Sequence, residues 1–274
     1  MLEQYSVLMS VYCKEQPEYL RESLMSMLGQ TVRTDDLVLI CDGPLTEELD
    51  QVIEEIAGAH PDVIRVHRLP RNEGLAKALN VGLGLCKHAL VARMDSDDIA
   101  LPQRCQLQLE KFEEDPSLSI VGGAVDEFER SPDEITSHKD MPQTHEQVMK
   151  YASRRNPFNH PTVMYRKQSV LEVGGYPMEM LHEDYALWAK MLMQGAKGCN
   201  LPQTLCLMRT DSKLYARRGG WKYLMQAIKL RWGFYRMGLY SGWNLIMVVG
   251  GLVVVCLVPV SVRKNFYRLF LRKK

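Results

Sequence analysis

The residues best suited to chemistry in this chain form one short acidic segment, Asp95-Ser96-Asp97-Asp98. The segment directly follows Arg93-Met94 and the apolar run Ala89–Ala92, which is typical of a buried parallel strand. Carboxylates at the end of such a strand need a counter-charge or a metal ion, because burying them unpaired is costly. In an open α/β sheet, the carboxyl end of a strand is also where ligands bind. The segment therefore predicts a divalent-cation site that serves a phosphate-bearing substrate.

The three carboxylates need not share one role. Mg²⁺ or Mn²⁺ bridging a diphosphate requires only one or two protein carboxylates. We expect Asp97 to contact the metal, and Asp95 to face either the ribose of a nucleotide or the water shell of the metal. Asp98 either belongs to the same site or caps the helix predicted to begin near Pro102. A D-x-D pattern alone is a weak signal, so its position after a predicted strand carries the argument.

Alternating strand and helix patterns in residues 1–115 supply the framework for this segment. Such an order implies a parallel sheet with right-handed crossovers. The predicted strands are Tyr5–Val11, Leu37–Cys41, Val63–Leu69 and Ala89–Met94. The intervening helices are predicted at Pro17–Leu28, after a cap at Thr46, and from Gly74 onward.

The regular alternation of strand and helix patterns ends after the acidic segment. The sequence predicts a helix over Pro102–Glu114 and an edge or excursion strand over Leu118–Phe128. Residues 129–147 are polar and read as a mobile loop. Further on, the patterns predict a strand reached through Asn156–Tyr165, a short helix at Lys167–Val173 and a helix at Glu183–Gln194.

Charge is distributed unevenly along the 274 residues, although the formal net charge is only +1. Residues 1–206 contain 20 Lys+Arg and 32 Asp+Glu, whereas residues 207–274 contain 14 and 1. A basic tail of this kind binds nucleic acid or an anionic membrane. The seven cysteines are odd in number and lack C-x-x-C spacing, so we expect reduced core residues and no zinc site. The first residues have no basic segment of the secretory type.

The C-terminal region favours a membrane over nucleic acid as the partner of the basic tail. Residues 219–237 mix aromatic and basic side chains in an amphipathic pattern typical of membrane-surface helices. Trp243–Val262 then carries no charge and is just long enough to span a bilayer. Gly250-Gly251 and Pro259 fit a re-entrant or interfacial hairpin equally well, and a buried helix of a soluble core remains an alternative. We expect membrane association and no nucleic-acid partner.

Six motifs follow one another in a fixed order along the chain: Ser6–Tyr12, Leu39–Gly43, Arg71–Asn80, Asp95–Asp98, Asn156–Thr162 and His182–Tyr185. In this order they resemble family 2 inverting glycosyltransferases, which have the GT-A fold. The resemblance covers roughly residues 5–215 and is strongest to bacterial enzymes of O-antigen and capsule assembly, including those that add hexose to GlcNAc-diphospho-undecaprenol. The fold expected from it is α/β: a mostly parallel sheet flanked by helices, followed by a basic and apolar helical tail that associates with the membrane.

The resemblance implies roles for individual residues at the nucleotide-sugar end of the site. Side chains at the end of the first strand and after the second strand would hold the uracil, and a turn of the form N-x-G would approach the nucleotide closely. This chain has Cys41-Asp42 where the family usually has two adjacent Asp residues. The uracil contact that the first Asp of that pair would make is therefore missing. The implied nucleotide-sugar-binding residues are Ser10, Tyr12, Asp42, Arg71, Asn72, Gly74, Asp95, Ser96 and Asp97.

The resemblance also implies an acid pair for catalysis. Glu183-Asp184 matches the family's pair, with Asp184 as the base that accepts the proton of the acceptor hydroxyl and Glu183 as the alternate. The simpler interpretation is that both residues favour a helix N-terminus. His160 and Arg209 are expected at the acceptor, although a structural His and a solvated Arg are the alternatives.

The sequence therefore predicts a UDP-sugar-dependent hexosyltransferase that needs Mn²⁺ or Mg²⁺. We expect transfer of galactose or glucose, with a β-1,3 linkage, to an undecaprenyl-diphosphate-linked GlcNAc at the cytoplasmic face of the bacterial inner membrane. The chain would comprise a glycosyltransferase domain at 1–215, with a nucleotide half at 1–115 and an acceptor half at 116–215, and a peripheral or anchoring tail at 216–274. The alternatives are a non-catalytic, membrane-anchored binding protein and another nucleotide-sugar enzyme. Neither G-x-G-x-x-G nor G-x-x-x-x-G-K-[ST] occurs, which argues against dinucleotide-binding dehydrogenases and P-loop enzymes.

Overall fold

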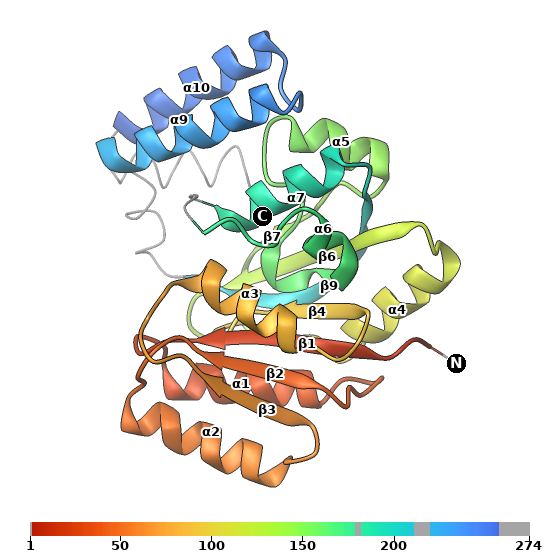
Figure 1. The fold of residues 1–274 in the computed structure, drawn as a ribbon, viewed down its shortest axis with the longest axis vertical. Coiled ribbons are helices and arrows are strands. Elements are labelled where there is room, and N and C mark those ends of the chain that lie inside the picture. The colour runs from red at the N-terminus through yellow and green to blue at the C-terminus, as the bar shows by residue number, and fades with distance from the viewer. Residues whose placement is uncertain (1, 179–181, 211–219, 258–274) are drawn as a thin grey trace.

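The structure is a computed structural model that describes residues 2–178, 182–210 and 220–257. A single nine-stranded sheet runs through these residues in the order β3-β2-β1-β4-β8-β6-β9-β5, with β7 paired to β6. Figure 1 shows the N-terminal strands at one end of the molecule and the helices α9 and α10 at the other.

The first half of the sheet is parallel, as the sequence predicts. β1 pairs with β2 on one side and with β4 on the other, and β2 pairs with β3. Every residue of β1, β2 and β4 is buried, which explains why these segments read as continuous apolar runs. The strands are β1 (Tyr5–Val11), β2 (Leu37–Cys41), β3 (Ile64–Arg68) and β4 (Leu90–Met94).

The crossover helices begin where local sequence signals place them. Pro17 occupies the first turn of α1, and the Thr46 side chain accepts a hydrogen bond from the N–H of Leu49 at the start of α2. Gly74 precedes α3 with a φ of 92°, a conformation that favours glycine. The helices are α1 (Pro17–Leu28), α2 (Glu47–Ala59) and α3 (Leu75–Leu85).

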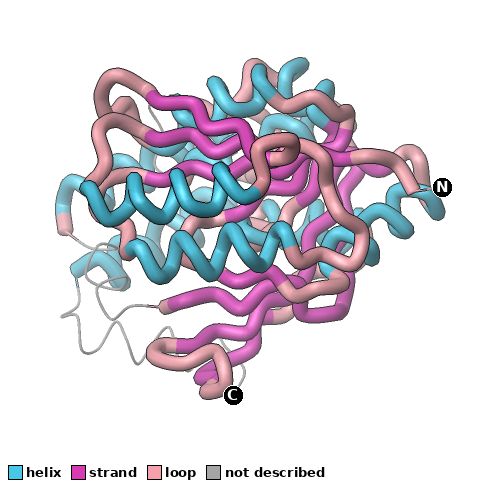
Figure 2. The backbone as a smooth tube through the Cα atoms, turned by 90° about the horizontal axis from the view of Figure 1, so that it is seen from below, coloured by secondary structure: helices cyan, strands magenta, loops and turns pink. Residues whose placement is uncertain are grey.

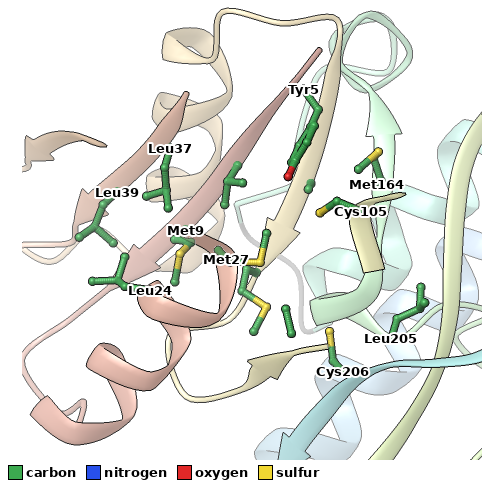
Figure 3. Close-up of a cluster of buried hydrophobic side chains, with 14 of the residues drawn as sticks. Tyr5, Met9, Leu24, Met27, Leu37, Leu39, Cys105, Met164, Leu205 and Cys206 are labelled. Atoms are coloured by element: carbon green, nitrogen blue, oxygen red, sulfur yellow. The ribbon is translucent and has the colours of Figure 1, made fainter. Parts of the chain in front are cut away.

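Two hydrophobic clusters lie on the two faces of the sheet, because successive side chains of a strand point to opposite faces. In β1, Val7 and Met9 belong to one cluster, whereas Leu8 belongs to the other. Figure 3 shows part of the first cluster, where Met9, Leu24 and Met27 lie together. Figure 2 gives the perpendicular view, with helices in cyan running alongside the magenta strands.

The second half of the sheet is mixed and differs from the sequence prediction in two respects. β6 is an interior strand that pairs with β7, β8 and β9, so the prediction of an edge position for residues 118–128 was wrong. The interval predicted as a mobile loop contains β7 and the first residues of α5. The long strand β9 was not predicted. The strands are β5 (Ile99–Ala100), β6 (Leu118–Phe128), β7 (Ile135–Lys139), β8 (Met164–Arg166) and β9 (Lys197–Arg209).

The remaining helices of this half belong to residues 104–193, which also contain the strands β6 to β8. The predicted helices at Lys167 and Glu183 are confirmed, and Thr144 caps α5 in a capping box with Gln147. The elements are α4 (Arg104–Glu114), α5 (His145–Ala152), the short 3₁₀ helix η1 (His160–Thr162), α6 (Lys167–Glu172) and α7 (Glu183–Met193).

The chain ends, within the described residues, in two helices that contact each other, α9 (Trp221–Arg236) and α10 (Gly242–Leu257). Phe234 of α9 packs against Tyr185 of α7, with ring centroids 4.6 Å apart, so α9 is joined to the hydrophobic cluster on that face of the sheet. Among the described residues, no helix has both the length and the apolar character that crossing a membrane requires. The last residues of the predicted 243–262 segment lie outside the described residues. Five of the six cysteines whose side chains are described are buried, as predicted, whereas Cys13 is exposed, so the prediction of a core position was wrong for that residue.

Candidate active site

The predicted nucleotide residues meet at the carboxyl ends of β1, β2 and β4. The chain runs from β1 outward through β2 to β3 and then returns to the other side of β1 as β4. Strand order thus reverses between β1 and β4, and ligands of open α/β sheets bind in the crevice at such a reversal. Ser10 and Tyr12 lie at the end of β1, and Asp95 follows the end of β4.

Asp42 organises the turn that precedes α3. One carboxylate oxygen of Asp42 accepts the N–H of Glu73 at 2.7 Å, and the other accepts the N–H of Gly74 at 3.0 Å. The Asn72 side chain in turn donates to the backbone oxygen of Asp42 at 3.1 Å. The two loops approach so closely that a Cβ on Gly43 would lie 2.5 Å from the backbone nitrogen of Asn72. The structure therefore brings the predicted Asp42, Asn72 and Gly74 together.

The other predicted nucleotide side chains border this turn. Ser10 is buried within β1, whereas Tyr12 is exposed immediately after the strand. Arg71 is exposed, and its Nε lies 3.6 Å from a carboxylate oxygen of Glu73. An exposed guanidinium beside a crevice is free to reorient toward a phosphate, because little packing holds it in place.

Asp95 and Ser96 are fixed by partners that the sequence does not reveal. A terminal nitrogen of Arg93, whose side chain is 1 % exposed, lies 2.5 Å from a carboxylate oxygen of Asp95. The Ser96 hydroxyl donates to the Glu15 carboxylate at 2.5 Å. Glu15 follows β1, so a fourth carboxylate, from a different strand end, joins the three of the acidic segment. The backbone oxygen of Asp95 accepts from the Ser23 hydroxyl of α1 at 2.6 Å.

Arg209 holds the other half of the acidic segment. Its backbone N–H donates to Asp98 at 2.8 Å, and its Nε donates to the backbone oxygen of Asp97 at 3.2 Å. The guanidinium also pairs with Glu22 at 2.6 Å and lies 3.7 Å from the ring centroid of Tyr19. Asp98 is thus buried and accepts a hydrogen bond from the backbone, and within the described residues neither Asp97 nor Asp98 forms a salt bridge, unlike Asp95.

Negative charge accumulates around Asp97. Burial, together with repulsion from Asp95 and Glu15, raises the pKa of Asp97 to about 7. Burial and the two neighbouring carboxylates also raise the pKa of Asp98. Burial opposes ionisation of Asp95 as well, but Arg93 and His160 lower the pKa of that carboxyl below its ordinary value. The single positive charge of Arg93 therefore does not neutralise the carboxyl groups of Asp95, Asp97 and Asp98.

This excess of negative charge fits a divalent cation. Among the described residues, no group of three or more His, Cys, Asp or Glu side chains is arranged to hold a metal ion without help. A cation here would need further ligands from a diphosphate and water, which is the usual coordination of Mg²⁺ in phosphate-transfer sites. Asp97 and Asp95 are the side chains that would hold it.

The predicted acid pair begins α7. Asn156 donates from its side-chain nitrogen to an Asp184 carboxylate oxygen at 2.5 Å, which fixes the orientation of that carboxylate. Burial and the neighbouring Asp184 raise the pKa of Glu183 to about 7. His182 precedes the helix with a φ of 57° and is the only described non-glycine residue with positive φ. Such a conformation is uncommon for a residue other than glycine.

His160 is close enough to both groups of carboxylates to be influenced by their charge. Its ring centroid is 5.9 Å from that of Tyr176 and 6.3 Å from that of Trp188. Burial, followed by the charge of Arg93, lowers the pKa of His160 to about 4, although Asp95 and Asp184 oppose this. Asp95 of the acidic segment and Asp184 of the acid pair therefore both lie near His160.

Sequence reasoning missed Arg93, Glu15 and Asn156. Arg93 carries a signal in retrospect, since a charged residue inside a buried strand needs a partner. Glu15 carries no such signal, because its partner is 81 residues away. Asn156 begins one of the motifs that carry the resemblance, but its contact with Asp184, 28 residues away, was not predicted.

Comparisons with known proteins find a matching family model and relatives of similar length. A family model described as "Glycosyl transferase family 2" matches residues 6–175. The chain is 38% identical over 269 residues to the UDP-Gal:alpha-D-GlcNAc-diphosphoundecaprenol beta-1,3-galactosyltransferase of Escherichia coli, covering 98% of this chain and 97% of the relative. It is 37% identical over 266 residues to the amylovoran biosynthesis glycosyltransferase AmsE of Erwinia amylovora, covering 96% and 97%.

The fold also has solved counterparts. The mannosyltransferase PcManGT of Pyrobaculum calidifontis, solved with GDP-Man and Mn²⁺, superposes with a TM-score of 0.66. The alignment covers 97% of this chain and 79% of that one at 16% identity, so it is a likeness of fold. The expected α/β architecture of the GT-A type is thereby confirmed.

Proposed function

The chain belongs to glycosyl transferase family 2, and we propose that it moves galactose or glucose from a UDP-sugar to an undecaprenyl-diphosphate-linked GlcNAc, forming a β-1,3 bond. The observation that carries this proposal is the meeting of two carboxylate groups, Asp95 with Asp97 and Glu183 with Asp184, around the β1/β4 crevice. Near-full-length similarity to a galactosyltransferase with that acceptor supports the substrate class and favours galactose.

The β1, β2 and α3 side of the crevice would bind the nucleotide. Ser10, Tyr12 and the Asp42–Asn72 turn would surround the uracil and ribose, with Gly74 allowing close backbone approach. Arg71 would reach a phosphate. Ser96 would contribute indirectly. Its hydrogen bond to Glu15 holds the acidic segment Asp95–Asp98 in position beside the nucleotide.

Asp97 and Asp95 would hold Mn²⁺ or Mg²⁺ against the diphosphate. When bound, the cation supplies electrostatic stabilisation of the leaving UDP. The protein's own contribution is to keep Asp95 ionised and oriented through Arg93, and to hold the Asp97–Asp98 turn through Arg209.

Asp184 would act as the general base. The acceptor hydroxyl oxygen attacks the anomeric carbon, the bond from that carbon to the UDP oxygen breaks, and the hydroxyl proton passes to Asp184. Attack from the face opposite the leaving group inverts the configuration. Asn156 orients the Asp184 carboxylate for this step, and the raised pKa of Glu183 leaves it partly protonated near neutral pH. We therefore favour Asp184 over Glu183 as the base.

The two predicted acceptor residues would contribute differently. His160 lies near both carboxylate groups and, with its lowered pKa, would be neutral when it lines the sugar-binding region. The donors of Arg209 are already engaged by Asp97, Asp98 and Glu22, so its proposed contribution is to hold the acidic segment.

The acceptor lipid sets where the enzyme would work. We propose action at the cytoplasmic face of the bacterial inner membrane, with the catalytic residues in 1–215 and a peripheral membrane association through 216–274. Confinement of enzyme and lipid to one surface raises their effective concentration.

A panel of UDP-hexoses, offered with a synthetic GlcNAc-diphospho-lipid, tests the proposal. Product should form from UDP-galactose or UDP-glucose with Mn²⁺ present, and EDTA should abolish it. Binding of UDP without product from any donor would contradict the proposed transfer and favour a binding protein. A matched acceptor without the diphosphate shows whether that group is recognised.

A further inference from the structure

Helix α9 has two apolar sides, of which the described structure covers one. Leu224, Leu230 and Phe234 are buried toward the core. On another side of the helix, Trp221 is 71 % exposed and Trp232 is 53 % exposed. Met225 and Tyr235 are also exposed, and the four outer residues follow the spacing of one helix face: Trp221, Met225, Trp232 and Tyr235. Large apolar side chains gathered in this way mark an interaction surface.

The neighbouring helix α10 repeats the pattern. Trp243 is 69 % exposed, and Ile246 and Met247, three and four residues further on, are exposed as well. α10 contains no charged residue. Figure 1 shows the two helices side by side at one end of the molecule, away from the strands β1 to β3.

Basic residues border the aromatic stripe of α9. Lys229 and Arg236 are exposed and seven residues apart, so they share a helix face next to Trp232. The two helices together contain four Lys or Arg and no Asp or Glu. Residues 1–206, by contrast, contain 20 Lys+Arg against 32 Asp+Glu. The two helices are therefore net positive beside their exposed aromatic side chains, whereas residues 1–206 are net negative.

We propose that the exposed faces of α9 and α10 bind an anionic phospholipid surface, with the helices lying in the interface. Trp and Tyr favour the boundary between headgroups and acyl chains, and Lys and Arg are attracted to anionic headgroups. A protein partner would not require the combination of aromatic side chains with an excess of positive charge. A second copy of the chain would have to bring these positive charges together, which electrostatic repulsion disfavours.

Helix α9 contacts the start of α7, the helix that begins with Glu183 and Asp184. The Tyr223 hydroxyl of α9 lies 3.0 Å from Nε2 of His182, the residue before Glu183. The Arg231 guanidinium lies 4.8 Å from the ring centroid of Tyr185, the residue after Asp184. If the proposed function holds, on which this consequence rests, docking through α9 brings the acid pair to the membrane that contains the acceptor.

Flotation of the full chain with phospholipid vesicles tests the docking surface directly. The protein should bind vesicles containing phosphatidylglycerol, and bind pure phosphatidylcholine vesicles weakly. Trp221→Ser with Trp232→Ser should weaken binding by about tenfold or more. The matched control, Met25→Ser with Leu171→Ser, removes exposed apolar side chains from α1 and α6 and should leave binding unchanged.

Charge reversal tests the contribution of the basic residues beside the aromatic side chains. Lys229→Glu with Arg236→Glu should remove the preference for phosphatidylglycerol, with a loss of about tenfold or more, while Lys87→Glu with Lys150→Glu should have a much smaller effect. All four variants should unfold at the temperature of the unmodified chain.

Three outcomes would overturn the docking surface: no vesicle binding by the unmodified chain, equal binding by the aromatic and control variants, or a dimer that the aromatic variants dissociate without any change in vesicle binding. Transfer to a short, water-soluble GlcNAc-diphosphate acceptor, measured alongside, keeps the two proposals separate. Absence of that transfer in every protein would contradict the proposed function and leave the vesicle result standing.

Discussion

Buried charge governs the individual residues of the site. Arg93 is enclosed within β4 and pairs with Asp95, and two of its guanidinium nitrogens, Nε and Nη1, are buried without a hydrogen-bond partner in the described structure. A buried ion pair is costly to break from one side, because the remaining charge is left without compensation.

Removing Arg93 should therefore harm the protein more than removing both members of the pair. Arg93→Met is expected to lower the free energy of unfolding by roughly 3–5 kcal/mol. Asp95→Asn in the same chain should restore part of that loss, because no buried carboxylate is left unpaired. Urea unfolding of the two single variants and the double variant measures the coupling. Simple additivity of the two losses would show that the pair does not act as one unit.

Glu183 should make stability depend on pH. Burial and Asp184 raise its pKa from 4.5 to about 7, so between these values the folded chain keeps a proton that the unfolded chain has lost. The free energy of unfolding must then fall as pH rises through this window. Glu183→Gln removes the titration, and should be more stable than the unmodified chain by ~1–2 kcal/mol at pH 8, with no gain below pH 4.5.

Urea unfolding at several pH values checks this, with Glu113→Gln on the exposed side of α4 as the control. A gap between Glu183→Gln and the unmodified chain that stays constant across the window would contradict the raised pKa.

Prediction from sequence succeeded for residues that belong to family motifs and missed the partners that hold those residues in place. Asp42, Asn72 and Gly74 were found through motifs, and the structure joins them by hydrogen bonds. The contacts of Asn156 with Asp184 and of Glu15 with Ser96 form only when elements 28 and 81 residues apart meet, so no local pattern indicates them. Arg93 is only two residues from Asp95, and its place inside a buried strand is the feature that could have indicated their ion pair.

At the scale of elements, the turns after β2 and before α3 form one unit. Gly43 has a φ of 90°, and a Cβ there would lie 2.5 Å from the backbone nitrogen of Asn72. Gly43→Ala should therefore lower stability by about 2 kcal/mol and weaken UDP binding, because it displaces the Asn72 turn.

Gly58→Ala provides the matched control for this prediction. Gly58 lies in α2, and a Cβ there would have no neighbour within 4 Å. This substitution should raise stability by roughly 0.5–1 kcal/mol and leave UDP affinity unchanged. Calorimetric titration with UDP separates the two variants. Equal UDP affinity in both would show that the turn does not shape the nucleotide site.

Elements with strong local signals were predicted to the residue. β1, β2 and α1 have the predicted ends, since each is an apolar run or a periodic helix bounded by turn residues. β9 was missed because Pro202 and its polar neighbours interrupt the pattern, and its long pairing with β6 is what makes it a strand. The interior position of β6 could not be predicted from the sequence either, because strand order depends on which distant segments pair.

At the scale of the whole molecule, the parallel half of the sheet and the acceptor half meet along β4 and β8. The carboxylates of the donor side follow β4, whereas the acid pair starts α7, which packs with α9. The division into a nucleotide half at 1–115 and an acceptor half at 116–215 stays a prediction. The packing of Phe234 on Tyr185 joins α9 to α7, so α9 helps to hold the helix that begins with Glu183 and Asp184.

The most direct test of the account is transfer from UDP-galactose to a GlcNAc-diphospho-lipid by the unmodified chain and by Asp184→Asn, with the anomeric configuration of the product read by NMR. The unmodified chain should form a β-linked product with Mn²⁺ present, because inversion converts the α-linked donor. Asp184→Asn should bind UDP equally well and turn over about 10²–10⁴-fold more slowly. An α-linked product, or undiminished turnover by Asp184→Asn, would contradict inverting transfer with Asp184 as the base.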